Sequence, residues 1–385
     1  MLALFAALAL AVVACGGGTG SETTQTTQAS TTPSTQATTS TTEAMTSTTA
    51  GASSTTEAMT GTAVKTCLVT DLAGVDDRSF NASAWQGVLD SVDAGYAQPD
   101  PILLESSVEA DYAPNLDQCL SQGAQHIVTV GFQLGDATQQ YAQDNPDVHF
   151  TIVDFSYPED IPNIRQLVFQ TDEAAYAAGY LAAGVSQSGT IGTYGGLNIP
   201  TVSIFMDGLA RGVAHYNEVK GTNVNVLGWN VDKQDGTFTG SFDPADPKVR
   251  ATCESLLDEG ADIILPVGGA INLPCGTAIQ DRGLDAALIG VDQDAYNAAP
   301  AEYQDLWLTT IEKHITVQVE RSLQDDFAGD WSGGKVVGNL ANDGVGLAPY
   351  HSWADKVPSE LDSEVQQILQ DIKDGKIDAA TFDVG

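Results

Sequence analysis

Residues 116–132 read LDQCLSQGAQHIVTVGF, and residues 253–269 read CESLLDEGADIILPVGG. In each stretch a helical pattern is followed by Gly-Ala, a short apolar run and a glycine, and the cysteine lies one helical turn further back in the second stretch. A helix followed by a buried strand is the unit of a parallel α/β sheet. Its appearance twice predicts two similar α/β halves. A cleft between such halves is a preferred site for a small molecule.

The rest of the chain from Ala63 onward alternates in the same way, which predicts parallel sheets with helices on both faces. The alternative is one large doubly wound domain. The expected strands are VKTCLVT (64–70), PILLE (101–105), HIVTV (126–130), HFTIVD (149–154), RQLVFQ (165–170), TIGTYGG (190–196), VNVLGWN (224–230), DIILPVGG (262–269) and ALIGVD (287–292). The expected helices cover residues 80–92, 134–143, 173–187, 202–218, 248–259 and 272–282.

The chain begins with an unbroken apolar run, MLALFAALALAVVA, which is followed by Cys15. As a helix this run spans roughly 21 Å, less than the roughly 30 Å of a hydrocarbon layer. We therefore expect residues 1–15 to be a lipoprotein signal peptide, with Cys15 as the lipidated residue. The alternative is an apolar N-terminal helix with an incidental cysteine.

Residues 16–62 consist mostly of Thr, Ser, Ala, Gly and Gln, and the heptapeptide STTEAMT occurs twice, at 40–46 and 54–60. Such a segment buries too little apolar surface to offset its ordering entropy, so we expect a solvated tether about 40 Å from end to end. A lipid, a tether and a globular part predict an exported protein held at the extracytoplasmic face of a cell membrane.

Composition excludes some partners. The formal net charge of −36 opposes nucleic-acid binding. Four cysteines follow Cys15, without the spacing of a zinc site, and in an exported domain they suggest two disulfides. Four cysteines allow three pairings. We favour Cys67 with Cys119 and Cys253 with Cys275, because each pair then lies within one half of the fold. We expect a monomer that needs neither metal nor cofactor.

In open α/β sheets ligands bind beyond the carboxyl ends of the strands, so the residues at those positions are the candidate site. Two rings there could sandwich a flat heterocycle, carboxylate and amide groups could bind a purine edge, and a carboxylate with a lysine could hold sugar hydroxyls. A flat base with a diol is a nucleoside, and no phosphate-binding loop is present. The candidates are Asp71, Phe80, Asn81, Phe132, Phe242, Gly268, Gly269, Asp292 and Lys313.

Several of these residues also have structural interpretations. Phe80 could pack a helix start, Phe242 could cover a core edge, and Asp292 with Lys313 could be a structural salt bridge. We expect Phe205 to be a core residue, and Asp77 or Ser79 to cap the helix that begins at Phe80. The five histidines show no pattern and are taken as core or surface residues.

At these same positions the chain resembles the basic membrane protein family of solute-binding lipoproteins, the purine-nucleoside receptors of ABC importers. The segment VTDLAGVDDRSFNASAWQGV (69–88) resembles the opening signature of that family. The resemblance continues through GFQLGDATQQYAQDNPDVHFTIVD, DEAAYAAGYLAAGVSQSGTIGTYGG, FMDGLARG, GSFDP, GADIILPVGG, GVDQD and LTTIEKHI.

The resemblance implies a type I periplasmic-binding fold, with two Rossmann-like lobes that are joined by a multi-strand hinge and close on a nucleoside. It implies that Asp71 and Phe80 meet the base and that Phe242 stacks on its other side. Asp292, Lys313 and Gly268 or Gly269 would then hold the ribose. The expected boundaries are 63–170 for lobe 1, completed by about 291–325, and 171–290 for lobe 2, completed by about 326–385.

The function expected from these features is capture of inosine, guanosine or adenosine without chemistry, followed by delivery to an ABC transporter permease. One alternative is a sugar or other small-solute receptor or sensor on the same fold. A less favoured alternative is a nucleoside-processing enzyme, because Asp292 and Asp294 lie near the expected sugar. Nucleoside hydrolases, however, hold calcium in a dense aspartate cluster, which this spacing does not supply.

Overall fold

The computed structural model describes residues 61–382 and residue 384, all of which lie in the second of the two units, 1–57 and 58–385, into which the chain divides. The expected signal peptide, the lipidation candidate Cys15 and nearly all of the expected tether therefore lie outside the described residues. Within the part that is described, no helix combines the length and the apolar character needed to cross a membrane.

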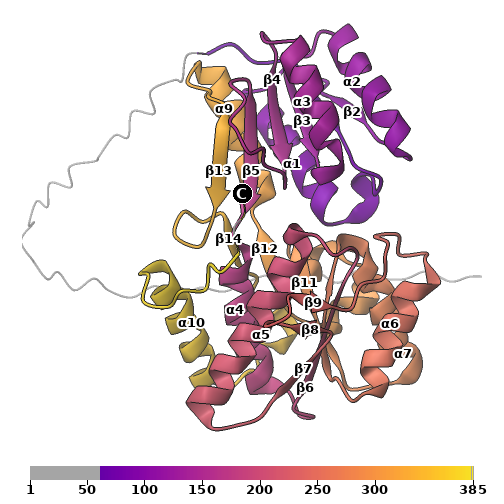
Figure 1. Cartoon of the computed structure of the whole chain (residues 1–385), viewed down its shortest axis with the longest axis vertical. Helices are drawn as coiled ribbons and strands as arrows, with labels where there is room; N and C mark the ends of the chain where they lie inside the picture. Colours follow the sequence, from indigo (N-terminus) through magenta and orange to yellow (C-terminus); the bar gives the residue numbers. More distant parts are fainter. Residues whose placement is uncertain (1–60, 383, 385) are drawn as a thin grey trace, which may run out of the picture. The chain divides into compact units, whose positions relative to one another are not determined.

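Two six-stranded sheets form two lobes (Figure 1). The first sheet runs, in spatial order, through β2 (Ile102–Leu104), β1 (Thr66–Val69), β3 (His126–Val130), β4 (His149–Val153), β5 (Ile164–Phe169) and β13 (Gly334–Gly338). The second runs through β7 (Asn225–Leu227), β6 (Thr190–Gly195), β10 (Ile263–Val267), β11 (Ala287–Asp292), β12 (Trp307–Lys313) and β14 (Val345–Leu347). A small hairpin, β8 (Trp229–Asn230) with β9 (Asp235–Gly236), lies beside the second sheet.

Neighbouring strands are parallel throughout both sheets, except that β14 runs antiparallel to β12. The two similar stretches, 116–132 and 253–269, supply β3 and β10, and each of these strands holds the third place in its sheet. The expected α/β class with two parallel-sheet lobes is confirmed.

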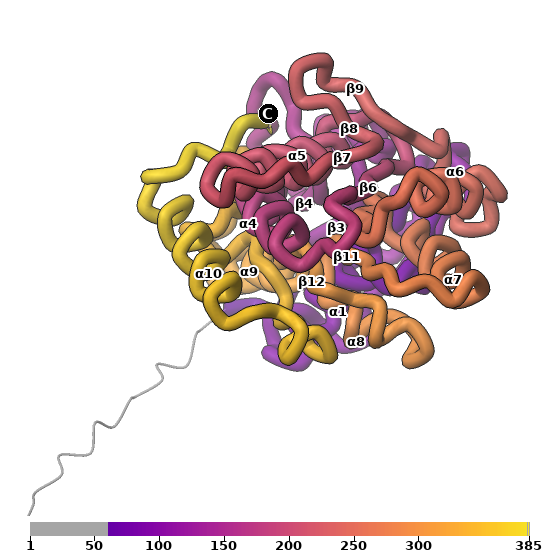
Figure 2. Tube along the Cα trace, turned by 90° about the horizontal axis from the view of Figure 1, so that it is seen from below, coloured from indigo at the N-terminus to yellow at the C-terminus, as the bar shows by residue number. Residues whose placement is uncertain are grey.

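Helices cover both faces of each sheet, because the strands are apolar on both sides. In the first lobe, α1 (Phe80–Asp93) and α9 (Ile315–Ala328) share one core, and α2 (Tyr112–Ser121) and α3 (Gly135–Asp144) lie over the other face. In the second lobe, α4 (Thr171–Val185), α5 (Pro200–Lys220) and α10 (Ser359–Lys373) lie on one side. On its other side lie α6 (Pro247–Asp258) and α7 (Asn272–Arg282), and the short α8 (Ala295–Ala298) precedes β12. Figure 2 shows α10 beside α4.

The chain passes between the lobes three times. It crosses between β5 and α4, between β12 and α9, and between β13 and β14. Of the expected completion of lobe 1 by residues 291–325 and of lobe 2 by residues 326–385, the placement of α9, β14 and α10 agrees with the structure, whereas β12 and β13 lie in the other lobe. β12 belongs to the second sheet, because it pairs in parallel with β11, from which only a short connection separates it. β13 belongs to the first sheet, where it pairs with β5.

Helices α4 and α5 approach each other closely through glycines. A Cβ atom at Gly212 would overlap the carbonyl oxygen of Tyr176, and a Cβ at Gly179 would overlap that of Leu209. The obstructing atoms are backbone atoms of a packed helix, so they cannot turn aside as a side chain can. Glycine is required at these positions because the two backbones are in contact.

We predict that Gly212→Ala lowers the free energy of unfolding by about 2 kcal/mol, because the two helices must separate to admit the methyl group. Urea denaturation monitored by circular dichroism measures the effect. Gly276→Ala is the matched control: its Cβ would meet the ring of Tyr303 at 2.9 Å, and this half-buried side chain can move. Equal stability of the two variants would contradict the prediction.

Candidate functional site

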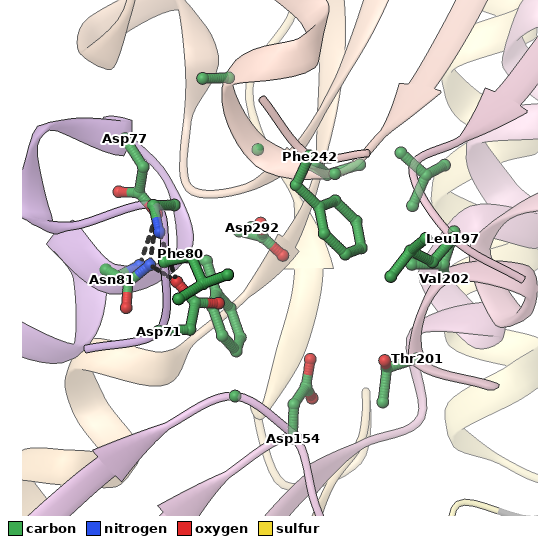
Figure 3. Close-up of a pocket in the computed structure, with 18 of the residues that line it drawn as sticks. Asp71, Asp77, Phe80, Asn81, Asp154, Leu197, Thr201, Val202, Phe242 and Asp292 are labelled. Atoms are coloured by element: carbon green, nitrogen blue, oxygen red, sulfur yellow. Dashed lines mark hydrogen bonds between the residues drawn. The ribbon is translucent and has the colours of Figure 1, made fainter. Parts of the chain in front are cut away.

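A cavity of about 500 Å³ lies between the lobes, beyond the carboxyl ends of strands from both sheets (Figure 3). It is built where parallel strands give way to helices or glycine turns, which is the general position of ligand sites in such folds. The structure brings all nine sequence-derived candidates to its wall: Asp71, Phe80, Asn81, Phe132, Phe242, Gly268, Gly269, Asp292 and Lys313.

One end of the cavity is formed by the turn between β1 and α1. Asp71 follows β1, and its Oδ1 accepts hydrogen bonds from the backbone N–H of Ala73 (3.0 Å) and from Nδ2 of Asn81 (2.8 Å). Burial raises the pKa of the Asp71 carboxyl above its ordinary 3.8, although these two hydrogen bonds act in the opposite direction. Oδ1 of Asn81 is buried and accepts no hydrogen bond from the described residues. This end therefore offers acceptor oxygens to a ligand.

Asp77 caps the start of α1, as one of the two alternatives expected from the sequence, Asp77 or Ser79. Its carboxylate accepts from the backbone N–H groups of Ser79, Asn81 and Ala82 at 2.7–3.0 Å. The hydroxyl of Ser79 makes no such cap. It donates instead to Oδ2 of Asp292 in the second lobe, at 2.8 Å. The α1 turn is thus hydrogen-bonded directly to the opposite side of the cavity.

Two aromatic rings approach the cavity from different lobes. Phe80 opens α1, whereas Phe242 comes from the loop between β9 and α6, and Figure 3 shows both rings directed toward the space between them. The ring of Phe242 lies against two glycine turns. A Cβ at Gly268 would lie 2.6 Å from Cδ1 of that ring, and a Cβ at Gly196 would overlap it. The absence of side chains at these glycines therefore sets the position of the ring.

A buried lysine stands at the centre of the site. Lys313 ends β12, and its Nζ forms an ion pair with Asp154 and lies 3.8 Å from Oδ1 of Asp292. The same Nζ lies 5.4 Å from the centroid of the Phe80 ring and 5.1 Å from that of Phe205, within the range of cation–π attraction. Burial raises the pKa of Asp154, and Lys313 opposes that rise.

Two of these carboxylates are held by unusual backbone geometry. Asp154 and Asp292 follow or end their strands with φ values of 62° and 71°, in the left-handed region that short polar residues tolerate best. Such conformations cost free energy and persist only where the surroundings enforce them. They turn the two carboxylates toward Lys313.

The charge of the cavity wall is unbalanced. Six aspartates line it, Asp71, Asp76, Asp77, Asp154, Asp243 and Asp292, against the single cation Lys313. A phosphate-bearing ligand would meet this surplus of negative charge at close range. Hydrogen-bond donors such as hydroxyl and N–H groups suit the site better.

Sequence reasoning left several cavity residues out of the candidate site, among them two that lie beside Lys313, Asp154 and Phe205. Asp154 ends the expected strand HFTIVD, and its position at a strand end was the available signal. Phe205 is buried, as expected for a core residue, but it also lines the cavity next to Lys313. Ile199, Thr201 and Val202 at the start of α5 complete this wall.

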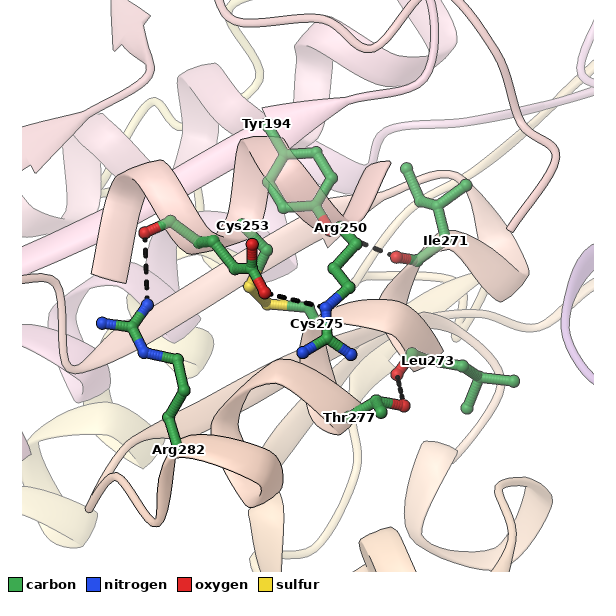
Figure 4. The surroundings of a disulfide bond; sticks show 9 residues. Tyr194, Arg250, Cys253, Ile271, Leu273, Cys275, Thr277 and Arg282 are labelled. Atoms are coloured by element: carbon green, nitrogen blue, oxygen red, sulfur yellow. Dashed lines mark hydrogen bonds and ion pairs between the residues drawn. A yellow bond between two sulfur atoms is a disulfide. The ribbon is translucent and has the colours of Figure 1, made fainter. Parts of the chain in front are cut away.

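The four cysteines form the two expected disulfides. Cys67 of β1 is joined to Cys119 of α2, and Cys253 of α6 is joined to Cys275 of α7. Figure 4 shows the second disulfide below Tyr194, whose hydroxyl donates to the carbonyl oxygen of Ile271 at 3.1 Å. Each bond links elements within one lobe, so neither restrains movement of one lobe against the other.

Comparison with known proteins places the chain among transport proteins. A family model described as ABC transporter substrate-binding protein PnrA-like matches residues 64–380. The ABC transporter nucleoside-binding protein BmpA of Lactococcus lactis subsp. cremoris is 29% identical over 337 residues, which cover 82% of this chain and 89% of that protein. Basic membrane protein B of Borreliella afzelii is 27% identical, covering 70% of this chain and 76% of its own length.

Solved structures agree in fold. An ABC transporter solute-binding protein from Aeropyrum pernix K1 superposes with a TM-score of 0.70 at 23% identity, covering 82% of this chain and 92% of that one. A solute-binding protein from Conexibacter woesei gives 0.63 at 22% identity, covering 82% and 98%. With the match to the family model across both lobes, the chain belongs to the PnrA-like family of ABC transporter substrate-binding proteins.

Proposed function

We propose that this protein is an extracytoplasmic lipoprotein that captures a purine nucleoside between its lobes and delivers it to an ABC permease. Cys15 would carry the lipid and residues 16–62 would be the tether. Asp71, Asn81, Phe80, Phe132 and Phe242 would bind the base, and Asp292, Lys313 and the Gly268–Gly269 turn would bind the ribose. No covalent step is involved.

The observation that carries this proposal is the pairing of two rings from different lobes with a wall that is rich in carboxylates. Rings on both sides suit a flat base, and each stacked pair contributes roughly 0.5–1.5 kcal/mol beyond area burial. Asp292 and Asp154 beside Lys313 suit vicinal hydroxyls, which can donate to the carboxylates and accept from the ammonium group. The excess of aspartates disfavours nucleotides.

The relatives support the same class of ligand. BmpA of Lactococcus lactis subsp. cremoris is named for nucleoside binding, and the match with that protein spans most of both chains. A sugar receptor on the same fold would use the carboxylates and Lys313 and would bind free ribose as well as a nucleoside. A nucleoside-processing enzyme would release free base, which chromatography of a nucleoside incubated with the protein would detect.

Calorimetric titration with inosine, guanosine, adenosine, uridine and ribose tests the proposal. We expect purine nucleosides to bind with micromolar or tighter affinity, which corresponds to at least about 8 kcal/mol, and we expect no heat from ribose. Binding of ribose without nucleosides would replace the proposal with a sugar receptor.

Variants of two phenylalanines locate the base in the same titration. Phe80→Leu keeps most of the apolar volume but loses the flat ring, so purine affinity should fall about three- to tenfold. Phe155→Leu is the control, because Phe155 lines a neighbouring cavity and not this one. Equal losses in both variants would mean that Phe80 does not stack on the base.

Asp292→Asn should weaken the binding of nucleosides but leave the binding of free bases nearly unchanged. The substitution keeps the size of the side chain and an acceptor for Ser79, but it removes the charge that strengthens hydrogen bonds from the ribose. We expect inosine affinity to fall on the order of ten- to a hundredfold and hypoxanthine affinity to change little. Unchanged inosine affinity would refute the ribose assignment.

Nucleoside affinity should also weaken as the pH falls from 7 toward 4. The pKa of Asp71 is raised by burial, so this carboxyl takes up a proton at a higher pH than an ordinary aspartate and then loses acceptor capacity. Calorimetry across this range measures the change. In Asp71→Asn, affinity should be lower at pH 7 and less dependent on pH, and Asp154, whose pKa is also raised by burial, accounts for the dependence that remains.

Protonation of Asp71 does not destabilise the fold, so unfolding caused by this group cannot explain a loss of nucleoside affinity at low pH. A raised pKa means that the native state holds the proton more tightly than the unfolded chain does. This group alone therefore makes stability rise as the pH falls from the raised pKa to 3.8. An affinity in the wild type that does not change between pH 7 and 4 would contradict a role for ionised Asp71.

A further inference from the structure

A second cluster of polar side chains lies at the opposite end of the first sheet. His126 begins β3, His149 begins β4, and the two residues are directly paired in register. Asp326 approaches them from α9. Its Oδ2 lies 2.7 Å from Nδ1 of His126 and 3.0 Å from Nδ1 of His149. One carboxylate oxygen and two imidazole nitrogens thus converge on one point.

We propose that His126, His149 and Asp326 form a binding site for a divalent transition metal ion, for which Zn²⁺ is the probe. The three ligand atoms lie within 4.8 Å of one another, and together they offer two nitrogens and one oxygen. Neutral imidazole and carboxylate are the ligands that Zn²⁺ takes, at about 2.0–2.2 Å. The two distances from Oδ2 of Asp326 to the histidine nitrogens, 2.7 and 3.0 Å, need to lengthen by about 0.3 to 0.6 Å to reach the roughly 3.3 Å of a tetrahedral shell.

The surroundings already hold the two rings. Nε2 of His126 is hydrogen-bonded to Oγ1 of Thr151 at 2.8 Å, which keeps Nδ1 directed at Asp326. The ring of His149 is stacked on Trp331, with centroids 4.0 Å apart and planes 9° apart. Outer groups of this kind orient metal-bound histidines in proteins.

Access and charge also suit a metal ion. The side chain of His126 is fully buried, but that of His149 is 35% exposed, so an ion can enter from that side and keep a water molecule as its fourth ligand. Arg165 lies nearby over Trp331, but its charge is balanced by the ion pair with Asp325 at 2.8 Å. The formal net charge of −36 raises the concentration of cations around the protein.

The second lobe shows that the fold does not need these histidines. In the repeated stretch, Ile263 begins β10 where His126 begins β3, and Ala287 begins β11 where His149 begins β4. Ile263 and Ala287 are buried and apolar. A buried imidazole costs desolvation that an isoleucine does not. The presence of histidines in the first lobe, where the second lobe has apolar residues, therefore points to an interaction that only the first lobe makes.

Zinc titration of the full-length protein, freed of metal with chelator, tests the proposal. We expect one strongly bound Zn²⁺ per chain and a rise in Tm when zinc is added, because the ion binds the native state. His149→Gln should weaken zinc affinity at least tenfold, and Asp326→Asn should do the same. Bound Co²⁺ should show the visible absorption of a four-coordinate site in the wild type only.

His351→Gln is the matched control. His351 also pairs with a carboxylate, Asp294, at 2.7 Å, but it has no second histidine beside it. This variant should bind zinc as the wild type does. His149 is partly exposed, so His149→Gln remains testable even if Asp326→Asn does not fold. Equal zinc affinity in the wild type and His149→Gln would overturn the proposal and assign the zinc to scattered surface carboxylates.

The test is independent of nucleoside capture. β3 separates the metal candidates from the interlobe cavity by its five residues, about 16 Å at the rise of a strand. His149→Gln should therefore bind inosine as the wild type does. Failure of the zinc site would leave the nucleoside results unchanged, and the reverse also holds.

Discussion

The burial of Lys313 is the constraint on which the arrangement of the two lobes depends. An ammonium group that is 4% exposed must keep carboxylate partners or lose its charge. Its partners come from both lobes, Asp154 beyond β4 and Asp292 at the end of β11, and Lys313 itself stands where the chain crosses from β12 to α9. One positive and two negative groups leave the centre of the cavity with an excess of acceptors. The interaction that joins the lobes thus also selects ligands that donate hydrogen bonds.

The crossings between the lobes are reinforced by the end of the chain. Buried Asp172, just after the first crossing, accepts hydrogen bonds from the backbone N–H groups of Thr381 and Phe382 at 2.7 and 3.1 Å. Gln170 donates to the carbonyl oxygen of Phe382 at 3.0 Å. The C-terminal segment is therefore attached to the crossing itself and not to the outer surface of either lobe. A hinge built from a few element ends can absorb the backbone rotation of closure while both sheets stay rigid.

Local order in the sequence was enough to predict the repeated α/β units and the nine candidate residues of the cavity, because a strand followed by a turn and a helix places such residues by itself, although Asp154 at another strand end was left out. Longer-range features could not be predicted in this way. The pairing of Asp154 with Lys313 joins residues 159 positions apart. Strand β13 could not be assigned to the first sheet from its composition, because the chain leaves that lobe after β5 and returns to it only with α9. His126 and His149 have no meaningful spacing until β3 and β4 are known to be neighbours in register.

Under the proposed function, the division of the site between the lobes would make ligand binding and closure a single equilibrium. Asp71, Phe80 and Asn81 belong to the first lobe, whereas Phe242, Asp292 and Lys313 belong to the second. In that proposal a base is stacked on both faces only when the rings of Phe80 and Phe242 approach each other, so part of the binding free energy would exist only in the closed state. Such a difference in affinity is what allows a ligand to shift a conformational equilibrium. Without ligand, the hydrogen bond from Ser79 to Asp292 supplies only a small part of the free energy that holds the lobes together, since a single hydrogen bond to a charged group contributes only about 1.5–3 kcal/mol. A nucleoside that contacts both ends of the cavity would add the larger share of this free energy. The closed form would then signal an occupied site.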